Sequence, residues 1–402
     1  MIFRCKCYHS VLLVIVAVQM FICLLTFLIT PPGWESSNLQ AGEIGSIERI
    51  HVMLVMCVEH ENGTMKEEEY KNNFLQVHSL LKTLAVFSSR PVTVHLAHNN
   101  NTIATRVEEA VNKFEKGDWL RIAGVSIEYP PGMEDMINSY KICATAKMFF
   151  PDLLPELDAG IYLDYDILML GDPALLWDRF KLFSPFTALA LAPVDASYRM
   201  KKGKQRIPFY GLPQAGLNSG VILMNLTRLR ALSGAGFTGT VRYIWNEWGK
   251  ENLPYPEMDM LNLVGEQAPY LLQPLPCEWH FTIWQCRFLP CPAARQHGFG
   301  LLHGADDVFY GRNNYFDVVL FTVAKFWFEQ DVKNWDAASG LVDLEARLEN
   351  AMEGKNANAP GECANVPGFN DMLLIRLRNI VKNSEMSLLS TVPSWGDWVF
   401  RV

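Results

Sequence analysis

Two aspartates that interrupt an apolar stretch are the residues best suited to chemistry in this chain. Asp164 and Asp166 lie one residue apart within residues 160–168, whose other side chains are typical of a buried strand of a parallel sheet. Charged groups seldom occupy such a place unless something pairs with them. Where the chain bends, carboxylates at i and i+2 can converge on one divalent cation, which often bridges protein to substrate phosphates. Taken alone, an Asp-x-Asp pair is more often a strand end followed by a solvated turn.

A histidine lies at a second predicted strand end. The run Leu-Leu-His-Gly at 301–304 places His303 at the tip of a short apolar segment, and imidazole is a common metal ligand. A single histidine in such a place is more often structural than a ligand. The local pattern alone therefore does not connect His303 with the two aspartates.

Strands and helices alternate along the first half of the chain, which predicts an α/β fold. The predicted strands lie at 51–58, 91–97, 125–129 and up to Asp164, and the predicted helices at 72–87, 102–114 and 141–154. Such alternation indicates parallel βαβ units of a doubly wound sheet, in which ligands collect at the carboxyl ends of strands. No G-x-G-x-x-G or P-loop pattern follows the first strand, which weighs against a dinucleotide oxidoreductase or a P-loop nucleotidase.

The second half continues the alternation less regularly. The predicted elements are a helix at 172–180, strands at 187–192 and 221–226, a helix at 258–264 and the strand that ends at His303. From about 335 the chain is less periodic, with a Gly-, Asn- and Pro-rich segment at 354–368, and it is expected to wrap the core or to be partly mobile. Half of the residues are hydrophobic, so the chain can bury a large core in one large α/β domain.

The N-terminal segment is predicted to cross a membrane. Residues 11–30 contain no charged side chain, and a helix of that length spans about 30 Å, the thickness of a bilayer core. Arg4 and Lys6 precede the span, so the positive-inside rule places the N-terminus in the cytoplasm and the remainder in a lumen or outside the cell. A cleaved signal peptide is the alternative. The predicted organisation is a cytoplasmic tail (1–10), a transmembrane signal anchor (11–30), a stem (31–48), a main domain (49–330) and a C-terminal extension of uncertain structure (331–402).

Cysteines and glycosylation motifs are compatible with a lumenal location. Six cysteines lie beyond the predicted span, and in an oxidising lumen an even number suggests disulfides. The cluster Cys277, Cys286 and Cys291 is expected to contribute at least one, with a zinc site as the alternative and the pairing left open. The Asn-x-Thr motifs lie at Asn62, Asn100 and Asn225. The formal net charge of −8 gives no sign of a nucleic-acid partner.

Four features occur in a fixed order along the chain. They are a strand ending Asp-Tyr-Asp, the segment Gly-Leu-Asn-Ser-Gly at 216–220, the acidic segment Glu-Met-Asp-Met-Leu-Asn at 257–262, and Leu-His-Gly at 302–304. This order resembles the retaining glycosyltransferases of family eight, which have the GT-A nucleotide-sugar fold with helices flanking a mostly parallel sheet. Within the family, the likeness is greatest to the glucoside xylosyltransferases. Further matching segments are Phe-Tyr-Gly at 209–211, Cys-Glu-Trp at 277–279 and Lys-Ile-Cys-Ala at 141–144, and the resemblance covers roughly residues 50–325.

The resemblance implies a site for a divalent cation and a UDP-sugar. Asp164, Asp166 and His303 would bind the cation, and this mixed set of oxygen and nitrogen ligands favours manganese over calcium. The cation would stabilise the nucleoside diphosphate that leaves during transfer. Lys147 falls where relatives carry an arginine near the nucleotide, so it would contact the nucleotide as a point charge. The alternative for Lys147 is a solvated lysine on a helix.

Other residues are implied to contact the donor. Asn218 and Ser219 fall where relatives contact the donor sugar, although without the family context a polar turn would be the simpler interpretation. Gly220 would permit close approach of the backbone. The further residues expected at the nucleotide are Asp164, Tyr165, Gly304 and Arg312.

Two segments depart from the family pattern. Relatives carry Asp-Gln at positions 257 and 258, near the anomeric carbon, where the amide oxygen has been considered as a nucleophile or an ion-pair stabiliser. Met258 has no amide and Glu257 adds a methylene, and a small misplacement at a reacting centre can cost ~100-fold in rate. Asp259 matches the xylosyltransferase pattern, so Glu257 and Asp259 are the catalytic candidates. Relatives also carry a lysine after Gly304, for which only Arg312 is a plausible replacement.

By resemblance, the protein is expected to move xylose from UDP-xylose, with retention, to O-linked glucose on epidermal-growth-factor-like (EGF-like) repeats of glycoproteins. It would be a single-pass type II protein of the Golgi or endoplasmic reticulum membrane with a lumenal catalytic domain. Two alternatives stay open. One is a relative that binds a UDP-sugar or a glycoprotein without transfer, and the other is a transferase of another UDP-sugar.

Overall fold

The computed structural model describes residues 48–390, with gaps at 59, 62–63, 140, 196–214, 254, 288–290, 311–315 and 354–360. The described residues belong to one compact unit, Ile47–Val402. The predicted cytoplasmic tail, the signal anchor at 11–30 and nearly all of the stem lie outside the described residues. None of the helices within the described ranges is long and apolar enough to cross a membrane.

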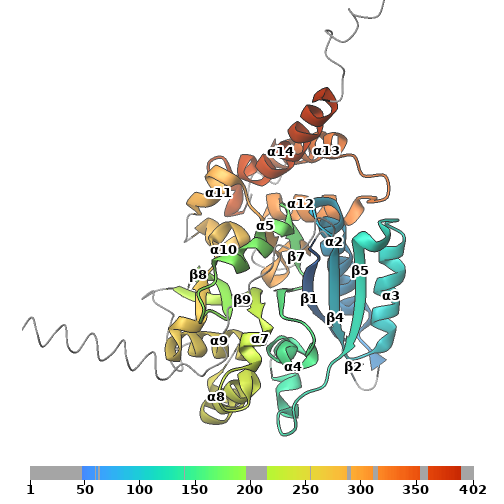
Figure 1. The fold of residues 1–402 in the computed structure, drawn as a ribbon. Helices are drawn as coiled ribbons and strands as arrows, with labels where there is room; N and C mark the ends of the chain where they lie inside the picture. The colour runs from blue at the N-terminus through green and yellow to red at the C-terminus, as the bar shows by residue number, and fades with distance from the viewer. Residues whose placement is uncertain are drawn as a thin grey trace, which may run out of the picture. The chain divides into compact units, whose positions relative to one another are not determined.

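A seven-stranded sheet forms the centre of the unit, in the order β10-β8-β9-β6-β1-β4-β5 (Figure 1). The strands are β1 (Ile50–Met56), β4 (Val92–His98), β5 (Leu120–Ser126), β6 (Ala159–Leu163), β8 (Leu189–Asp195), β9 (Ala215–Asn225) and β10 (Leu272–Pro274). β1 pairs in parallel with β4 and β6, β4 with β5, and β10 with β8, whereas β9 runs antiparallel to both of its neighbours. The predicted α/β fold with a mostly parallel sheet is therefore confirmed.

Side chains alternate between the two faces of the sheet and fill two cores. On β1, Val52 and Leu54 belong to one core, and Met53 and Val55 belong to the other, as the two-residue period of a strand requires. Helices α2 (Glu67–Phe87), α3 (Asn101–Asn112) and α12 (Val318–Glu329) contribute to the first core. Helices α8 (Gly236–Asn252) and α9 (Pro256–Gln267) contribute to the second. A strand buried on both faces explains why β1 is apolar almost throughout.

Two predicted boundaries in the first half are wrong. The helix predicted at 72–87 is α2, which begins at Glu67, and the three glutamates of its first turn favour that start because they lie at the positive end of the helix dipole. The strand predicted at 125–129 is β5, which lies at 120–126 and pairs along its length with β4. β5 is an edge strand whose side chains after Leu120 are partly or fully exposed, so its apolar content is too low to mark its position.

The helix predicted at 141–154 is divided into two short pieces. A 3₁₀ helix at Ala144–Phe149 precedes one helical turn, α4 (Phe150–Leu153). Pro151 lies in the first turn of α4, where its missing N–H is tolerated, whereas inside a continuous helix it would remove a hydrogen bond. Cys143 precedes the 3₁₀ helix in a left-handed conformation with φ 58° and is joined by a disulfide to Cys57, just beyond β1. This crosslink fixes the segment beside the carboxyl end of β1.

A second sheet of two strands brings His303 next to the aspartates. β7 (Ile167–Met169) follows Asp166 directly and pairs antiparallel with β11 (Leu301–His303), so that His303 lies opposite Ile167. The backbone N–H of Gly304 donates to the carbonyl of Asp166 at 2.7 Å. The pairing therefore aligns two segments that lie far apart in the sequence.

The C-terminal extension contains two long helices that pack against the rest of the unit, in agreement with the expectation that this part wraps the core. α13 (Ala337–Glu353) packs against α12 and α14 (Phe369–Ser390), and α14 packs against α11 (Pro292–His297) (Figure 1). α13 buries only a narrow stripe, Gly340, Leu344 and Leu348. Because one member of that stripe is a glycine, the apolar period is weak in the sequence.

Three disulfides join the six cysteines beyond the predicted span, namely Cys57–Cys143, Cys277–Cys291 and Cys286–Cys363. The expectation of a disulfide within the cluster at 277–291 is confirmed. The zinc alternative is wrong, because the sulfurs of Cys277 and Cys291 are bonded to each other. The third bond ties the short helix α10 (Ile283–Arg287) to the segment that precedes α14.

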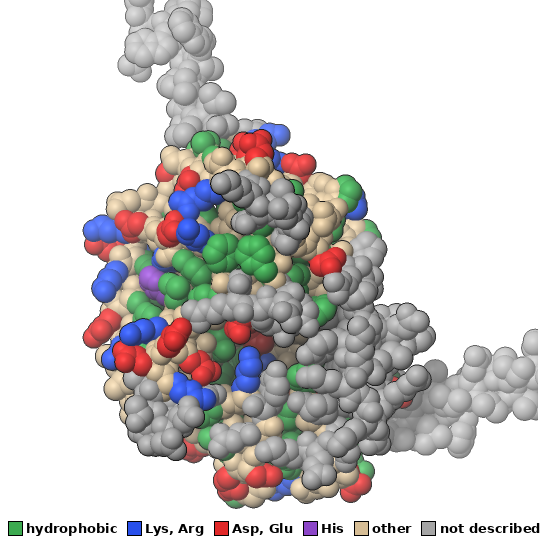
Figure 2. All heavy atoms as spheres, turned by 180° about the vertical axis from the view of Figure 1, so that it is seen from behind, with side chains coloured by type: hydrophobic (Ala, Val, Ile, Leu, Met, Phe, Trp, Pro, Cys, Tyr) green, Lys and Arg blue, Asp and Glu red, His purple; other side chains and the backbone are tan. Residues whose placement is uncertain are grey.

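Charges of both signs are spread over the described part of one face of the molecule (Figure 2). On the face in Figure 2, Lys and Arg side chains are interspersed with Asp and Glu. This mixture, like the net charge of −8, offers a polyanion no continuous attractive field on the part of this face that is described.

Candidate active site

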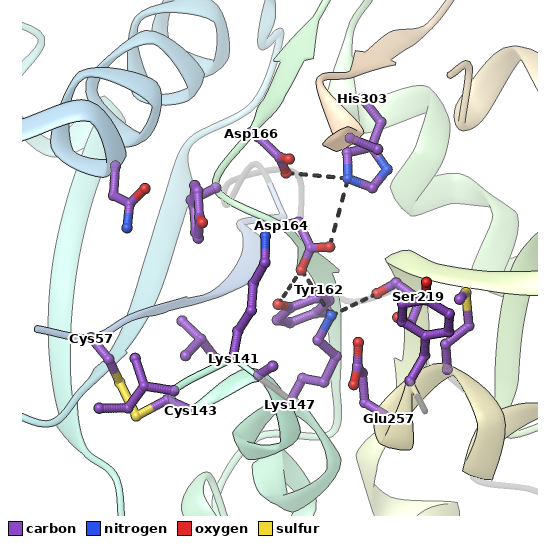
Figure 3. Close-up of a pocket in the computed structure, with 18 of the residues that line it drawn as sticks. Cys57, Lys141, Cys143, Lys147, Tyr162, Asp164, Asp166, Ser219, Glu257 and His303 are labelled. Carbon is purple, nitrogen blue, oxygen red and sulfur yellow. Dashed lines mark hydrogen bonds and ion pairs between the residues drawn. A yellow bond between two sulfur atoms is a disulfide. The ribbon is translucent and has the colours of Figure 1, made fainter. Parts of the chain in front are cut away.

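A pocket of about 230 Å³ lies where the carboxyl ends of β1 and β6 meet the start of β9 (Figure 3). The first turns of α2 and α9 complete its wall. The predicted site residues that line it are Lys147, Asp164, Tyr165, Asp166, Asn218, Ser219, Glu257 and His303. Carboxyl ends of parallel strands are the usual place for a ligand in such a sheet.

Asp164, Asp166 and His303 converge on one wall of the pocket. Nε2 of His303 lies 3.2 Å from Oδ1 of Asp166 and 3.7 Å from Oδ2 of Asp164. One ligand atom from each of the three residues lies within 4.8 Å of the others. Two carboxylates and an imidazole supply the mixed oxygen and nitrogen donors that suit a divalent transition-metal ion. The three residues therefore fit a divalent cation.

Opposite charges stabilise the ionised forms of this cluster. Burial raises the pKa of Asp164, but the charges of Lys147 and His303 and hydrogen bonds from Lys147 and Tyr162 outweigh burial, so this pKa lies below its usual value. Burial lowers the pKa of His303, but the charge of Asp166 and its hydrogen bond outweigh burial, so this pKa lies above its usual value. A bound cation would replace the imidazole proton as the positive partner of the carboxylates.

Lys147 is buried against the first aspartate. Its side chain is only 4% exposed, and its Nζ donates to Oδ1 of Asp164 at 2.8 Å and to the carbonyl of Ser219 at 3.2 Å. The Tyr162 hydroxyl donates to the same carboxylate oxygen, and Lys147 Nζ lies 4.6 Å from the centre of the Tyr162 ring. The alternative of a solvated helix lysine is therefore wrong. Oδ1 of Asp164 accepts hydrogen bonds from Lys147 and Tyr162, whereas Oδ2 faces His303.

The start of β9 contacts the cluster of Asp164, Asp166 and His303, and it also lines the pocket. The carbonyl of Gly220 accepts from the backbone N–H of Asp164 at 2.8 Å, and Oδ1 of Asn218 accepts from the N–H of Gly220 at 2.7 Å. A Cβ placed on Gly220 would collide with Cε1 and Nδ1 of the His303 ring. Gly220 is thus required for the close approach of the imidazole.

The first turn of α9 supplies the other polar wall. Glu257 is 7% exposed, and no hydrogen-bond partner for its Oε2 lies among the described residues. Burial raises the pKa of Glu257, and the nearby charge of Lys147 opposes that rise. Met258 lines the pocket beside it. Asp259 is fully buried away from the pocket lining, and its Oδ2 accepts from the backbone N–H of Tyr255, the residue before α9, at 2.9 Å, so the structure gives it a contact that holds the start of the helix.

The remaining predicted residues are distributed as follows. Gly304 does not line the pocket; its backbone N–H donates to the carbonyl of Asp166, and a Cβ there would collide with the ring of Phe309. Arg312 and Asn62 lie outside the described residues. Asn100 and Asn225 are the N-cap residues of α3 and α7 (Leu226–Arg230), respectively. Glycosylation at these asparagines stays a prediction.

Several residues at the site were not predicted from the sequence. Tyr162 lies on β6 two residues before Asp164, which directly follows the strand, so the two-residue period of a strand was enough to find it. His280 is fully buried behind the pocket, with its Nε2 2.8 Å from Nδ1 of His303. No spacing rule connects positions 280 and 303, because the contact depends on how the chain folds between them. The Cys57–Cys143 disulfide also lines the pocket, and the sequence left its pairing open.

Comparison with known proteins agrees with this site. The sequence profile of glycosyl transferase family 8 matches residues 92–286, a range that contains both aspartates, β9 and the start of α9. Over that range the chain is similar to this family, and the family match together with the relatives below identifies it as a UDP-sugar-dependent glycosyltransferase. Its mostly parallel sheet with one antiparallel strand is the GT-A-like arrangement expected of the family.

The chain is also similar to individual proteins of known name. The chain is 27% identical to human glucoside xylosyltransferase 1 over 336 residues, which is 79% of this chain and 70% of that protein. It is 30% identical to glucoside xylosyltransferase 2 of Xenopus laevis over 277 residues, covering 65% of this chain and 62% of that protein. Among solved structures, mouse xyloside xylosyltransferase 1 in its apo form matches with a TM-score of 0.47 and 16% identity, covering 65% of this chain and 99% of that one.

Proposed function

We propose that the protein is a manganese-dependent α-1,3-xylosyltransferase that moves xylose from UDP-xylose to O-linked glucose on EGF-like repeats, with retention. The observation that carries the proposal is the convergence of Asp164, Asp166 and His303 in the same pocket as Lys147 and Glu257. The names of the glucoside xylosyltransferase relatives support the choice of donor and acceptor.

The aspartates and the histidine would hold the cation beside the donor diphosphate. When bound, the cation supplies Lewis-acid stabilisation of the charge that develops on UDP. Its ligands would be Oδ2 of Asp164, Oδ1 of Asp166 and Nε2 of His303, the atoms that face one another here. Lys147 neutralises the other oxygen of Asp164, which limits the negative charge that the diphosphate meets.

The opposite wall would bind the sugar. Glu257 presents a buried carboxylate oxygen that lacks a described partner, and a sugar hydroxyl would satisfy it. Asn218 and Ser219 also line the pocket, with Ser219 close to Glu257 in Figure 3, and they would contact other hydroxyls. These polar side chains together would fix the anomeric carbon relative to the diphosphate.

Transfer would then exchange one bond for another at the anomeric carbon. The acceptor hydroxyl oxygen bonds to that carbon on the face from which the phosphate leaves, and the carbon–phosphate-oxygen bond breaks. The hydroxyl proton passes to the departing phosphate oxygen of UDP. Glu257, beside the reacting carbon, would stabilise positive charge that builds on the sugar.

A lumenal setting would complete the proposal. Residues 11–30 would anchor the protein in the Golgi or endoplasmic reticulum membrane, with the catalytic unit on the lumenal side. The three disulfides support an oxidising compartment. Glycoproteins that carry EGF-like repeats pass through the same compartment in order to be modified.

Met258 favours a second candidate, a protein that binds a UDP-sugar without transferring it. The thioether lines the pocket at the position where relatives carry an amide, and it cannot act as a nucleophile through oxygen. In this case the wall formed by Asp164, Asp166 and His303 (the cation wall) would bind the donor, and the wall that carries Glu257 and Met258 (the sugar wall) would take no part in transfer.

One experiment separates these candidates. The protein is incubated with manganese, UDP-xylose and an O-glucosylated EGF-like repeat, and the repeat is weighed by mass spectrometry. We expect a gain of one pentose, which Asp166→Asn abolishes. Tight UDP binding with no gain would support the second candidate, whereas a gain only with UDP-galactose or UDP-glucose would assign another donor.

A further inference from the structure

His280 lies directly behind the imidazole of His303, on the side away from the pocket. It is fully buried and does not line the pocket, so it cannot touch a substrate or a cation there. Its Nε2 lies 2.8 Å from Nδ1 of His303, and the two rings meet edge to face with their centroids 4.9 Å apart. A hydrogen bond between these two nitrogens requires one to donate and the other to accept.

The direction of that hydrogen bond decides whether His303 can bind a cation. Nε2 of His303 faces Asp166 and Asp164, and it must present a lone pair to act as a ligand. Its single proton then lies on Nδ1 and is donated to Nε2 of His280. His280 must accept, so its own proton lies on Nδ1. A partner on the second nitrogen of a metal-binding histidine commonly fixes both the tautomer and the ring orientation.

The backbone around His280 is held independently of its imidazole. The His303 N–H donates to the carbonyl of Phe281 at 2.8 Å, so the segment runs beside β11. The side-chain amide of Gln285 donates to the carbonyl of His280 at 2.8 Å and accepts from the N–H of Thr282. The disulfides Cys277–Cys291 and Cys286–Cys363 flank the segment. Replacing the imidazole should therefore leave the backbone in place.

Backbone also approaches the ring of His303 closely. A Cβ on Gly220 would strike Cε1 and Nδ1 of this ring. Gly220 and His280 therefore both contact the ring at or beside Nδ1, while Nε2 is directed at the aspartates. No other described side chain is hydrogen-bonded to its Nδ1.

We infer that His280 is a positioning residue that sets the tautomer and orientation of His303 for cation binding. The inference rests on the cation site of the proposed function but does not depend on which sugar is transferred. It assigns to His280 a role in metal affinity and none in contact with the donor.

The test compares metal affinity in His280→Leu and His280→Gln. Leucine cannot accept a hydrogen bond, whereas the glutamine carbonyl can. Binding of Mn²⁺ in the presence of UDP is measured by electron paramagnetic resonance, with thermal unfolding as a check on folding. We expect Leu to weaken Mn²⁺ binding by about 10- to 100-fold and Gln to restore most of it. In assays, Leu should raise the manganese concentration for half-maximal activity more than it lowers kcat at saturating metal.

The chain provides a matched control in a second pair of histidines. Nδ1 of His51 lies 3.0 Å from Nε2 of His95 on neighbouring strands, and neither residue lines the pocket. His95→Leu removes a contact of the same kind and should leave Mn²⁺ affinity unchanged. Equal losses in His95→Leu and His280→Leu would overturn the inference, because they would indicate a general effect on packing.

The unmutated protein offers a check that needs no variant. With UDP and the diamagnetic ion Zn²⁺ bound, ¹⁵N chemical shifts should show the Nδ1–H tautomer at both His280 and His303. An Nε2–H tautomer at His280, or wild-type Mn²⁺ affinity in His280→Leu, would overturn the inference, as would a wild-type protein that binds no divalent cation. A protein whose Mn²⁺ affinity depends on His280 as described, but which transfers no xylose, would uphold the inference while contradicting the proposed function.

Discussion

The two walls of the pocket differ in how fully their polar groups are satisfied. On one wall, the negative charges of Asp164 and Asp166 are balanced by the imidazole of His303. Lys147 and Tyr162 donate hydrogen bonds to Oδ1 of Asp164. On the other, Glu257 buries a carboxylate oxygen that has no described hydrogen-bond partner. The first wall is organised before any ligand arrives, whereas the second has a polar group that a ligand must satisfy.

This difference separates binding from transfer. A preorganised cluster of opposite charges would retain a cation and a diphosphate whichever sugar is attached. The carboxylate on α9 acts at the sugar, where the family pattern is also altered by Met258. Substitutions on the two walls should therefore have different signatures, and four predictions follow from that contrast.

The largest effect is expected on the cation wall. Asp166→Asn removes a charged ligand, so both Mn²⁺ binding and transfer should fall, with kcat/KM reduced on the order of 10³-fold, equivalent to about 4 kcal/mol. The measurement is a donor titration at several manganese concentrations. Asp343→Asn, which alters an exposed carboxylate paired with Arg347 on α13, is the control. If Asp166→Asn bound Mn²⁺ as tightly as the wild type, Asp166 would not be a cation ligand and the two walls would not differ as described.

An intermediate effect is expected on the sugar wall. Glu257→Gln keeps the shape of the side chain but removes its charge, so we expect transfer to fall about 100-fold while UDP and Mn²⁺ bind normally. Calorimetry with UDP and a transfer assay on the same preparation separate the two quantities. If UDP binding weakened as much as transfer, Glu257 would belong to the nucleotide site instead.

A smaller effect is expected from pH. Cation binding needs an unprotonated His303, and Asp166 holds its pKa above the usual value of 6.5, so manganese affinity should fall by up to about tenfold per unit as pH drops below that raised pKa. Without cation, the same ion pair contributes stability that is fully present below the unfolded-state pKa and is lost as pH rises through the folded-state pKa. Manganese titrations between pH 6 and pH 8 test this. An affinity that is independent of pH would argue against His303 as a ligand.

The smallest effect on transfer is expected from Asp259, which lies on α9 but outside the pocket lining. Asp259 accepts a hydrogen bond from the N–H of Tyr255 and does not line the pocket. Asp259→Asn should therefore change kcat by less than about threefold, while Asp259→Ala should lower the free energy of unfolding by about 1 kcal/mol through loss of this hydrogen bond. Denaturant unfolding and transfer assays check both statements. A loss of transfer comparable to that in Glu257→Gln would return Asp259 to the catalytic group.

The sequence predicted the cation wall better than the sugar wall. Asp164 directly follows the carboxyl end of β6, the usual place for a ligand in such a sheet. His303 was connected with it only through the family order of motifs, and it reaches the aspartates by the antiparallel pairing of β11 with β7. Asp259 follows Glu257 by two residues on α9, where that spacing points side chains in different directions around the helix. The motif therefore named Asp259, but the helix turns it away from the pocket.

The unpredicted features arise from contacts between distant segments. His280 meets His303 only because the chain at 281 runs beside β11. The 3₁₀ helix that carries Lys147 lies between the Cys57–Cys143 crosslink and Pro151 of α4, features that apolar periodicity does not encode. Local patterns thus identified the strands and the charged residues, whereas pairings between segments decided which of these residues meet.

The central claim is that Asp164, Asp166 and His303 hold a divalent cation that binds the diphosphate of the donor. Calorimetric titration of UDP into the wild-type protein and His303→Ala, each with and without Mn²⁺, tests this claim most directly. The account predicts that the wild type binds UDP tightly only when Mn²⁺ is present and that His303→Ala loses most of this dependence. Equally tight UDP binding by both proteins in the absence of a cation would contradict it.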